Sequence, residues 1–166
     1  MRLVNAHTGE TFEGTYRDEH GPIGRVMDEL CIFLRDYHTG EKVQIDIGVI
    51  DFLADVLAAV GETKATILSA YRTSATNTIL ARTTFGVAEH SQHIYGPALD
   101  FHLDSKLAEA MSAAREAKRG GVAGTLIRAS YTSIPGRCGI GISMSAGWIA
   151  SWNSIRVSSE SGAMAS

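Results

Sequence analysis

The stretch from Glu89 to His102, EHSQHIYGPALDFH, concentrates side chains that can bind metal ions. It holds three histidines and one aspartate within fourteen residues. Zinc accepts imidazole nitrogen and carboxylate oxygen as ligands, and a catalytic zinc site usually combines three protein ligands with a water. His93 and Asp100 could supply two of the three, which suggests a metal site. By spacing alone, a surface pair or a hydrogen-bonded pair in the core is the more common arrangement.

The elements around these residues must bring them together. Gly96 and Pro97 predict a turn after His93, followed by a strand over residues 97–103 with alternating apolar and polar side chains. The alternation assigns the strand residues to two faces: Ala98, Asp100 and His102 to one, Leu99 and Phe101 to the other. A histidine at the end of a loop and a carboxylate on the next strand can then converge on one point.

The rest of the chain up to about residue 120 has clear patterns. We expect a hairpin over residues 2–17 that turns at HTGE, and a strand over residues 65–70. Helical spacing of apolar residues predicts four helices, over residues 22–37, about 46–60, 74–82 and 105–118. Gly61 is expected to end the second helix, and Asp104 to cap the fourth. Pro22 suits a first helical position. Beyond Gly121 the periodicity fades, and we predict no elements there.

These patterns predict the α+β class, with helices packed against a small, mostly antiparallel sheet whose cleft carries the site. A chain of 166 residues suits one domain with one active surface, and we expect a monomer. The formal net charge is -3 and there is no basic stripe, which argues against nucleic acid as a partner.

We also find neither an apolar run of about 20 residues nor the apolar core of a secretory signal. Cys31 lies in an apolar helical pattern, so a buried thiol is favoured over a disulfide with Cys138.

Several motifs together resemble a known family. The run SQHIYGPALD, from Ser91 to Asp100, fits the S-x-H-x-x-G-x-A-x-D signature of zinc peptidases in the superfamily of lysostaphin, the D-alanyl-D-alanine carboxypeptidases and Sonic hedgehog. The chain most resembles the YcbK-like murein endopeptidases within this superfamily. The likeness also includes LVNAHTGE at residues 3–10, LRD at 34–36 with TGE at 39–41, and ILSAYRTSATN at 67–77, and it covers roughly residues 1–122.

This resemblance implies a hedgehog-like and DD-peptidase-like fold and hydrolysis of the peptide stems that cross-link peptidoglycan. It implies zinc as the cofactor, His93 and Asp100 as ligands, and the periplasm or cell envelope as the location. Arg72, in the family's Y-R-[ST] motif, would stabilise negative charge on the tetrahedral intermediate; the alternative is a structural salt-bridge arginine. Ser91 is expected to support the loop by a hydrogen bond, and Tyr71 either shapes the cleft or packs beside the strand.

The chain departs from the family pattern where the third ligand is expected. A late F-V-H-x-D-x-G strand should follow a glycine-rich segment, but GGVAG at residues 120–124 is followed by SYTSIP at 130–135, and no histidine occurs after His102. Two ligands hold zinc more weakly than three, and the general base is missing as well. His102 is a candidate third ligand and His90 a weaker one; the alternative for His102 is a histidine that covers the sheet edge.

These departures leave hypotheses from different classes. The first is an active zinc-dependent murein peptidase. The second is an inactive peptidoglycan-binding module, or pseudoenzyme, that keeps the cleft, and the third is a domain in which the histidine and aspartate are only structural. We divide the chain into a peptidase-like core over residues 1–124 and a divergent segment over 125–166. A shifted reading frame would explain why family likeness, charge and periodicity fade together near Gly124.

Overall fold

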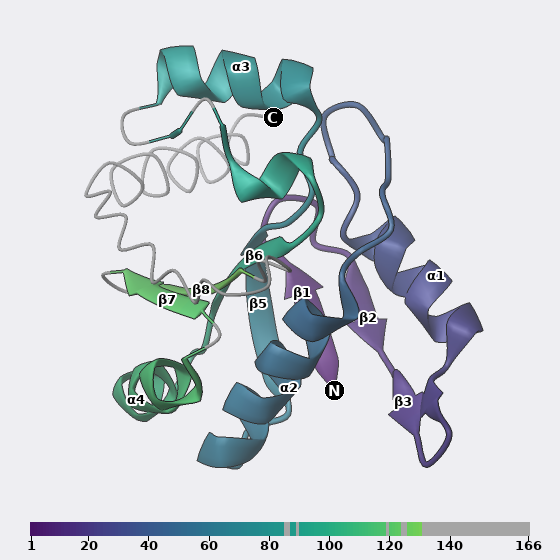
Figure 1. The fold of residues 1–166 in the computed structure, drawn as a ribbon, viewed down its shortest axis with the longest axis vertical. Coiled ribbons are helices and arrows are strands. Elements are labelled where there is room, and N and C mark those ends of the chain that lie inside the picture. The colour runs from purple at the N-terminus through teal and green to yellow at the C-terminus, as the bar shows by residue number, and fades with distance from the viewer. Residues whose placement is uncertain (85–86, 89, 119, 124–125, 131–166) are drawn as a thin grey trace, which may run out of the picture.

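The structure is a computed structural model, and it describes residues 1–84, 87–88, 90–118, 120–123 and 126–130. Within these ranges the chain forms helices α1 to α4, the short 3-10 helix η1 and strands β1 to β8 (Figure 1). In chain order they are β1 Arg2–Asn5, β2 Thr11–Glu13, β3 Arg17–Asp18, β4 Gly21–Pro22, α1 Gly24–Phe33, α2 Ile47–Val60, β5 Lys64–Ser69, α3 Ser74–Thr83, η1 Gln92–Ile94, β6 Ala98–His102, α4 Leu107–Ala117, β7 Gly120–Ala123 and β8 Leu126–Ser130.

The main sheet has the strand order β2-β1-β5-β6-β8-β7. Only β1 and β5 pair in parallel, and the other neighbours are antiparallel. This confirms the predicted α+β class with a mostly antiparallel sheet. The predicted hairpin is the β1–β2 pair, and strand β6 lies inside the sheet between β5 and β8.

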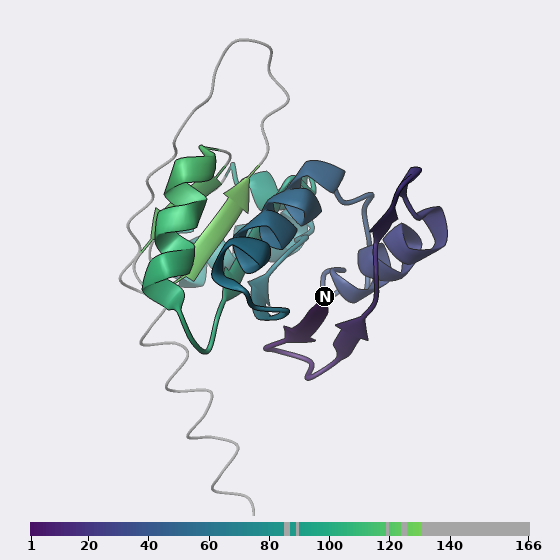
Figure 2. The ribbon, with the colours of Figure 1, turned by 90° about the horizontal axis from the view of Figure 1, so that it is seen from below.

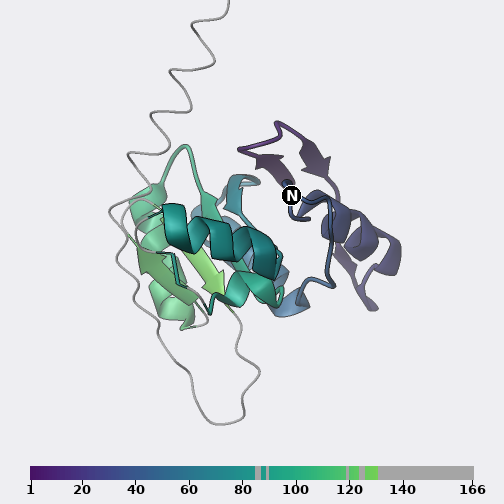
Figure 3. The same ribbon diagram turned by 90° about the horizontal axis from the view of Figure 1, so that it is seen from above.

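The helices lie on different sides of this sheet. Helices α2 and α4 contact each other and run side by side across one face, as the view from below shows (Figure 2). Helix α3 lies on the opposite side, with η1 close to it (Figures 1 and 3). The residues expected to do chemistry come from the α3 and η1 side, and the α2 and α4 side buries the core.

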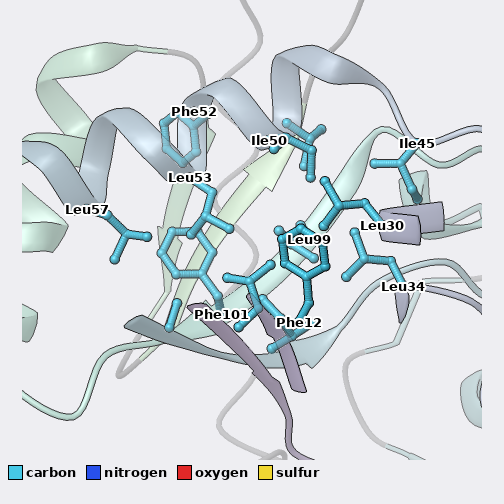
Figure 4. Packing of buried hydrophobic residues seen from close by; sticks show 14 of the residues in the cluster. Phe12, Leu30, Leu34, Ile45, Ile50, Phe52, Leu53, Leu57, Leu99 and Phe101 are labelled. Atoms are coloured by element: carbon cyan, nitrogen blue, oxygen red, sulfur yellow. The ribbon is translucent and has the colours of Figure 1, made fainter. Parts of the chain in front are cut away.

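The apolar core forms between helix α2 and the sheet. Leu99 and Phe101 of β6 are almost fully buried, and they face the apolar stripe of α2 and residues from β2 and α1 (Figure 4). The α2 residues in this cluster include Ile50, Phe52, Leu53 and Leu57. Asp100, between the two core residues, therefore points to the other face of the sheet, as the alternating pattern predicted.

Local signals in the sequence explain where the central helices begin and end. Asp46 caps α2 by accepting a hydrogen bond from the backbone of Gly48 at 2.7 Å, and Gly61 ends it in the left-handed conformation with φ 66°. Thr73 caps α3 by accepting one from the backbone of Thr76 at 3.1 Å. Each of these boundaries lies within a residue or two of the predicted one.

The predicted starts of two helices were wrong. Pro22 is not a first helical position but part of the short β3–β4 pair, and α1 begins at Gly24. Asp104 does not cap α4, which begins after Lys106 without a side-chain cap. The Asp104 carboxylate instead accepts a hydrogen bond from Lys64 Nζ at 2.8 Å, because β5 and β6 are neighbours and bring their ends together.

Strands β7 and β8 were missed by the sequence pattern. Strand β8 pairs with β6 from Ala98 to Phe101, so the main sheet continues to Ser130. The division of the chain at residue 124 stays a prediction, and residues 131–166 lie outside the described part.

Cys31 is a free, buried thiol as expected, while Cys138 lies outside the described residues. No helix in the described part of the chain is long and apolar enough to cross a membrane.

Candidate metal site

The fold brings His93 and Asp100 together below the surface. His93 lies in η1 and Asp100 at the centre of β6, and their side chains are only 2% and 5% exposed. His93 Nε2 lies 3.2 Å from Asp100 Oδ2. The predicted convergence of a loop histidine and a strand carboxylate is therefore present in the structure.

The other imidazole nitrogen of His93 is held by the backbone. His93 Nδ1 lies 2.6 Å from the carbonyl oxygen of Ala70 and 3.4 Å from Ser69 Oγ. Because a carbonyl oxygen only accepts hydrogen bonds, Nδ1 must carry the proton in the neutral ring. The lone pair of Nε2 then points toward Asp100, which is the orientation that a metal-binding histidine takes when its second nitrogen donates to a carbonyl group.

The geometry of this pair fits two ligands of one zinc ion. His93 Nε2 is buried and forms no hydrogen bond with any residue in the described ranges, although it is within ion-pair distance of Asp100. Two buried atoms with lone pairs, this close together, are stabilised by a cation between them. Ligands about 2.0–2.2 Å from a tetrahedral zinc lie about 3.3–3.6 Å from each other, and the 3.2 Å separation in this pair is close to the lower end of that range.

Within the described residues, no third ligand joins the pair. Among the residues that the structure describes, no three His, Cys, Asp or Glu side chains gather closely enough to hold a metal ion. His102 lies on β6, two residues after Asp100, and is half-buried, but it does not complete a group with the pair. His90 is exposed, and Glu89 lies outside the described residues. His102 as a third ligand stays a prediction.

Arg72 lies next to the pair, at the junction between β5 and α3. Its backbone N–H donates to the carbonyl oxygen of His93 at 3.0 Å, and its side chain is only 7% exposed. Arg72 Nη2 lies 3.4 Å from Ser91 Oγ, and the same oxygen accepts from the backbone N–H of His93 at 3.4 Å. Ser91 thus connects the arginine to the histidine, the supporting role expected for it.

A pocket opens beside Arg72. Its lining includes Ser69, Tyr71 and Arg72 at the junction, together with Arg35 and Tyr37 from the segment after α1. Tyr71 is half-buried and packs against the apolar core, so it meets both interpretations offered for it: it lines the pocket and packs beside the strand. The pocket also reaches Ala70, whose carbonyl oxygen is bonded to His93, while His93 and Asp100 are not among its lining residues.

Sequence reasoning missed three supporting groups. Ala70 acts through a backbone oxygen, which no side-chain pattern can reveal. Asn77 of α3 is 1% exposed and donates from Nδ2 to the carbonyl oxygen of Ala88 at 3.0 Å, on the loop that leads to His93. Asp36 is equally buried and binds Thr73, next to Arg72. Asp36 belongs to the LRD motif at residues 34–36, which marked it as part of the family pattern, but the motif did not indicate what its carboxylate binds.

Comparisons with known proteins agree on one family. The family model described as peptidoglycan L,D-endopeptidase MepK matches residues 1–130. The chain is 35% identical over 124 residues to peptidoglycan L,D-endopeptidase MepK from Escherichia coli strain K12 and from Shigella flexneri, covering 74% of this chain and 68% of each relative. It is 29% identical over 125 residues to the probable peptidoglycan L,D-endopeptidase MepK from Haemophilus influenzae, covering 74% of this chain and 67% of that protein. No solved structure gives a significant match.

Proposed function

Because the chain belongs to the peptidoglycan L,D-endopeptidase MepK family, we propose that it hydrolyses peptide cross-links in peptidoglycan as a zinc-dependent peptidase of the cell envelope. The observation that carries this proposal is the buried pair of His93 and Asp100, with Nε2 and Oδ2 3.2 Å apart and the imidazole oriented by a backbone carbonyl. The family supplies the substrate class, and the pair supplies the reason to expect a metal.

His93 and Asp100 would hold the zinc ion. The chain contributes a neutral nitrogen and a carboxylate oxygen, both already desolvated and fixed, so little ordering is needed when the metal binds. When bound, zinc supplies Lewis acidity toward a carbonyl oxygen and toward water. We propose His102 as the third ligand, since it is on the same strand face as Asp100 and two residues away.

Arg72 would stabilise the negative charge that develops on the scissile carbonyl. Its guanidinium is buried and its backbone is bonded to His93, so its position relative to the metal pair is fixed before substrate arrives. A guanidinium that is held in place, in a site from which water is excluded, stabilises such charge more strongly than a mobile surface arginine. The pocket beside Arg72 would receive the peptide stem.

A cleavage assay tests the proposal. We expect the zinc-loaded protein to release new muropeptides from purified peptidoglycan, detected by mass spectrometry, and we expect His93→Ala to abolish the release. His20→Ala is the matched control, because His20 is an exposed histidine whose side chain is 85% exposed. A parent protein that binds zinc and leaves peptidoglycan uncut would contradict the proposed activity.

The second candidate is a peptidoglycan-binding module without catalytic activity. It is favoured by one observation: no group of three metal-binding side chains is present within the described ranges. This candidate predicts that the protein sediments with peptidoglycan and that an excess of zinc produces no cleavage. Release of muropeptides that stops with a chelator would exclude it.

A further inference from the structure

The segment that follows helix α1 contains a buried acid outside the candidate metal site. Asp36 is only 1% exposed, although a carboxylate is costly to bury unless its oxygens accept hydrogen bonds. Oδ2 accepts from the backbone N–H of Thr73 at 2.9 Å and lies 3.0 Å from the Thr73 hydroxyl. Oδ1 accepts from the backbone N–H of His38 at 2.9 Å. Oδ2 therefore joins two distant parts of the chain, while Oδ1 stabilises the local turn that carries Asp36.

The backbone around Asp36 is closed into a compact turn. The N–H of Asp36 donates to the carbonyl oxygen of Glu41 at 2.9 Å, and the N–H of Gly40 donates to that of Asp36 at 2.7 Å. Gly40 has φ 77°, which glycine adopts without strain. The carboxylate is thus presented from a rigid turn, and it can determine the position of whatever binds to it.

The same segment holds the backbone on both sides of Arg72. The N–H of Tyr71 donates to the carbonyl oxygen of Leu34 at 3.2 Å, and the N–H of Thr73 donates to Asp36. The N–H of Arg72 itself donates to His93 at 3.0 Å. Three successive backbone N–H groups are therefore held by two separate parts of the fold, and the direction in which the Arg72 side chain leaves the backbone is fixed.

We infer that Asp36 is a positioning residue, which sets the place of the Arg72 guanidinium next to His93 and Asp100 by holding Thr73. The inference rests on the proposed function for its catalytic consequence, but the positioning itself is a structural property. Asp36 acts through Thr73, whose backbone N–H and hydroxyl both donate to its Oδ2. Burial acts to raise the pKa of the Asp36 carboxyl, but hydrogen bonds from Thr76, Thr73 and His38 together outweigh it, so the pKa is lowered.

The Asp36→Asn variant tests the inference with two independent measurements on the full chain. An amide group has one acceptor atom and one donor group where the carboxylate has two acceptors, so either Thr73 or His38 must lose its partner. We expect faster hydrogen exchange of the Thr73 amide and a shifted NMR resonance of the Arg72 Nε–H group. We also expect kcat to fall on the order of 10- to 100-fold, with KM and zinc stoichiometry unchanged.

Asp51→Asn is the matched control. Asp51 also accepts hydrogen bonds from two side chains, Tyr16 at 2.8 Å and Arg17 at 2.8 Å, but these belong to the chain around β3 and not to the junction at Arg72. It should lower stability without moving the Arg72 resonance or kcat. If Asp36→Asn lowers stability in the same way and leaves the Arg72 resonance and kcat as in the parent, Asp36 is merely structural and the inference is overturned.

A second pair of variants covers the case in which Asp36→Asn does not fold. Thr73→Val removes the hydroxyl that donates to Oδ2 and also caps α3, while the carboxylate and the Thr73 backbone N–H are kept. It should shift the Arg72 resonance and lower kcat, and Thr73→Ser, which keeps both hydroxyl contacts, should restore both values. A normal Arg72 resonance and kcat in Thr73→Val would overturn the part of the inference that assigns positioning to the Thr73 hydroxyl, since the backbone N–H of Thr73 still donates to Oδ2 in this variant. If the parent protein cleaves nothing, the proposed function fails, and the Arg72 resonance alone decides whether Asp36 positions it.

Discussion

His93 Nε2 and Asp100 Oδ2 lie 3.2 Å apart in a region closed to solvent, and the histidine's other nitrogen is bonded to the carbonyl oxygen of Ala70. The tautomer set by Ala70 leaves two atoms with lone pairs facing each other. A positive charge between the two atoms, either a metal ion or a proton on Nε2, stabilises this arrangement. The geometry of the pair fits two ligands of one zinc ion, and this fit is the basis of the proposed metal site.

Replacing the carboxylate by an amide should separate metal binding from stability. In Asp100→Asn, the amide can donate a hydrogen bond to His93 Nε2, so the metal-free protein should lose less than about 1 kcal/mol of unfolding free energy. Zinc affinity should fall at least about 100-fold, because an anionic ligand is lost. Denaturant unfolding and competitive zinc titration measure the two effects. Equal zinc affinity in Asp100→Asn and the parent would show that Asp100 is not a ligand.

Arg72→Lys should lower activity without affecting the metal. Lysine keeps the positive charge but cannot aim two donors at one oxygen, so we expect kcat to fall on the order of 100-fold with zinc affinity unchanged. Arg25→Lys is the control, because the Arg25 side chain is 82% exposed and pairs with Glu29 on the helix surface. Steady-state cleavage of a muropeptide provides the comparison. Similar kcat values for the two variants would argue for a structural arginine at position 72.

The loop between His93 and Asp100 should need glycine at position 96 to keep its backbone conformation. Its φ is 88°, and a Cβ atom there would lie 3.0 Å from both the Gln44 carbonyl oxygen and Val43 Cγ1. Gly96→Ala should therefore lower the unfolding free energy by about 2–4 kcal/mol, from backbone strain and the close contact together. It should also weaken zinc binding, since the loop must move.

Gly9→Ala separates these two causes. Gly9 has φ 72°, but a Cβ atom there meets nothing within 4 Å, so only the strain of about 1–2 kcal/mol applies. Thermal or denaturant unfolding of both variants gives the comparison. The same loss at the two positions would mean that the contact between Gly96 and residues 43–44 contributes nothing.

The Asp36 carboxylate should contribute to the pH dependence of stability. Its folded-state pKa is lowered from an ordinary value of 3.8, so the unfolded chain binds more protons at mildly acidic pH. The stabilisation is therefore complete well above pH 3.8 and is lost as the pH falls through the folded-state pKa. In Asp36→Asn, the unfolding free energy should fall less steeply with acid than in the parent. If the unfolding free energy falls equally steeply with acid in the two proteins, the Asp36 carboxylate does not contribute to the pH dependence.

The sequence predicted those parts of the fold whose signals are local. Asp46 and Gly61 bound α2 because a side-chain cap and a left-handed glycine act within one turn of the helix. Alternation placed Asp100 opposite Leu99 and Phe101 for the same reason. Asp104 misled because its partner, Lys64, lies 40 residues away in the sequence. Pro22 misled for a different reason, because it pairs with Arg17 in a short local hairpin that precedes the helix.

The site was predicted only in part, for a similar reason. His93, Asp100 and Arg72 could be named from a motif, but the groups that orient them act across long sequence separations. The Ala70 carbonyl and the Asp36 carboxylate have no local pattern that indicates what they bind. Strands β7 and β8 are short, and they are stabilised as strands by pairing with each other and with β6, which periodicity along one segment does not reveal.

Zinc stoichiometry and affinity of the purified protein test the central claim most directly. Competitive titration should show one zinc ion bound by the parent, lost in His93→Ala and Asp100→Asn and retained in His20→Ala. Loss in His102→Ala as well would identify His102 as the third ligand, whereas unchanged binding would remove it from the site. A parent protein that binds no zinc, or that binds it equally well in His93→Ala, would contradict the account of this pair as a metal site.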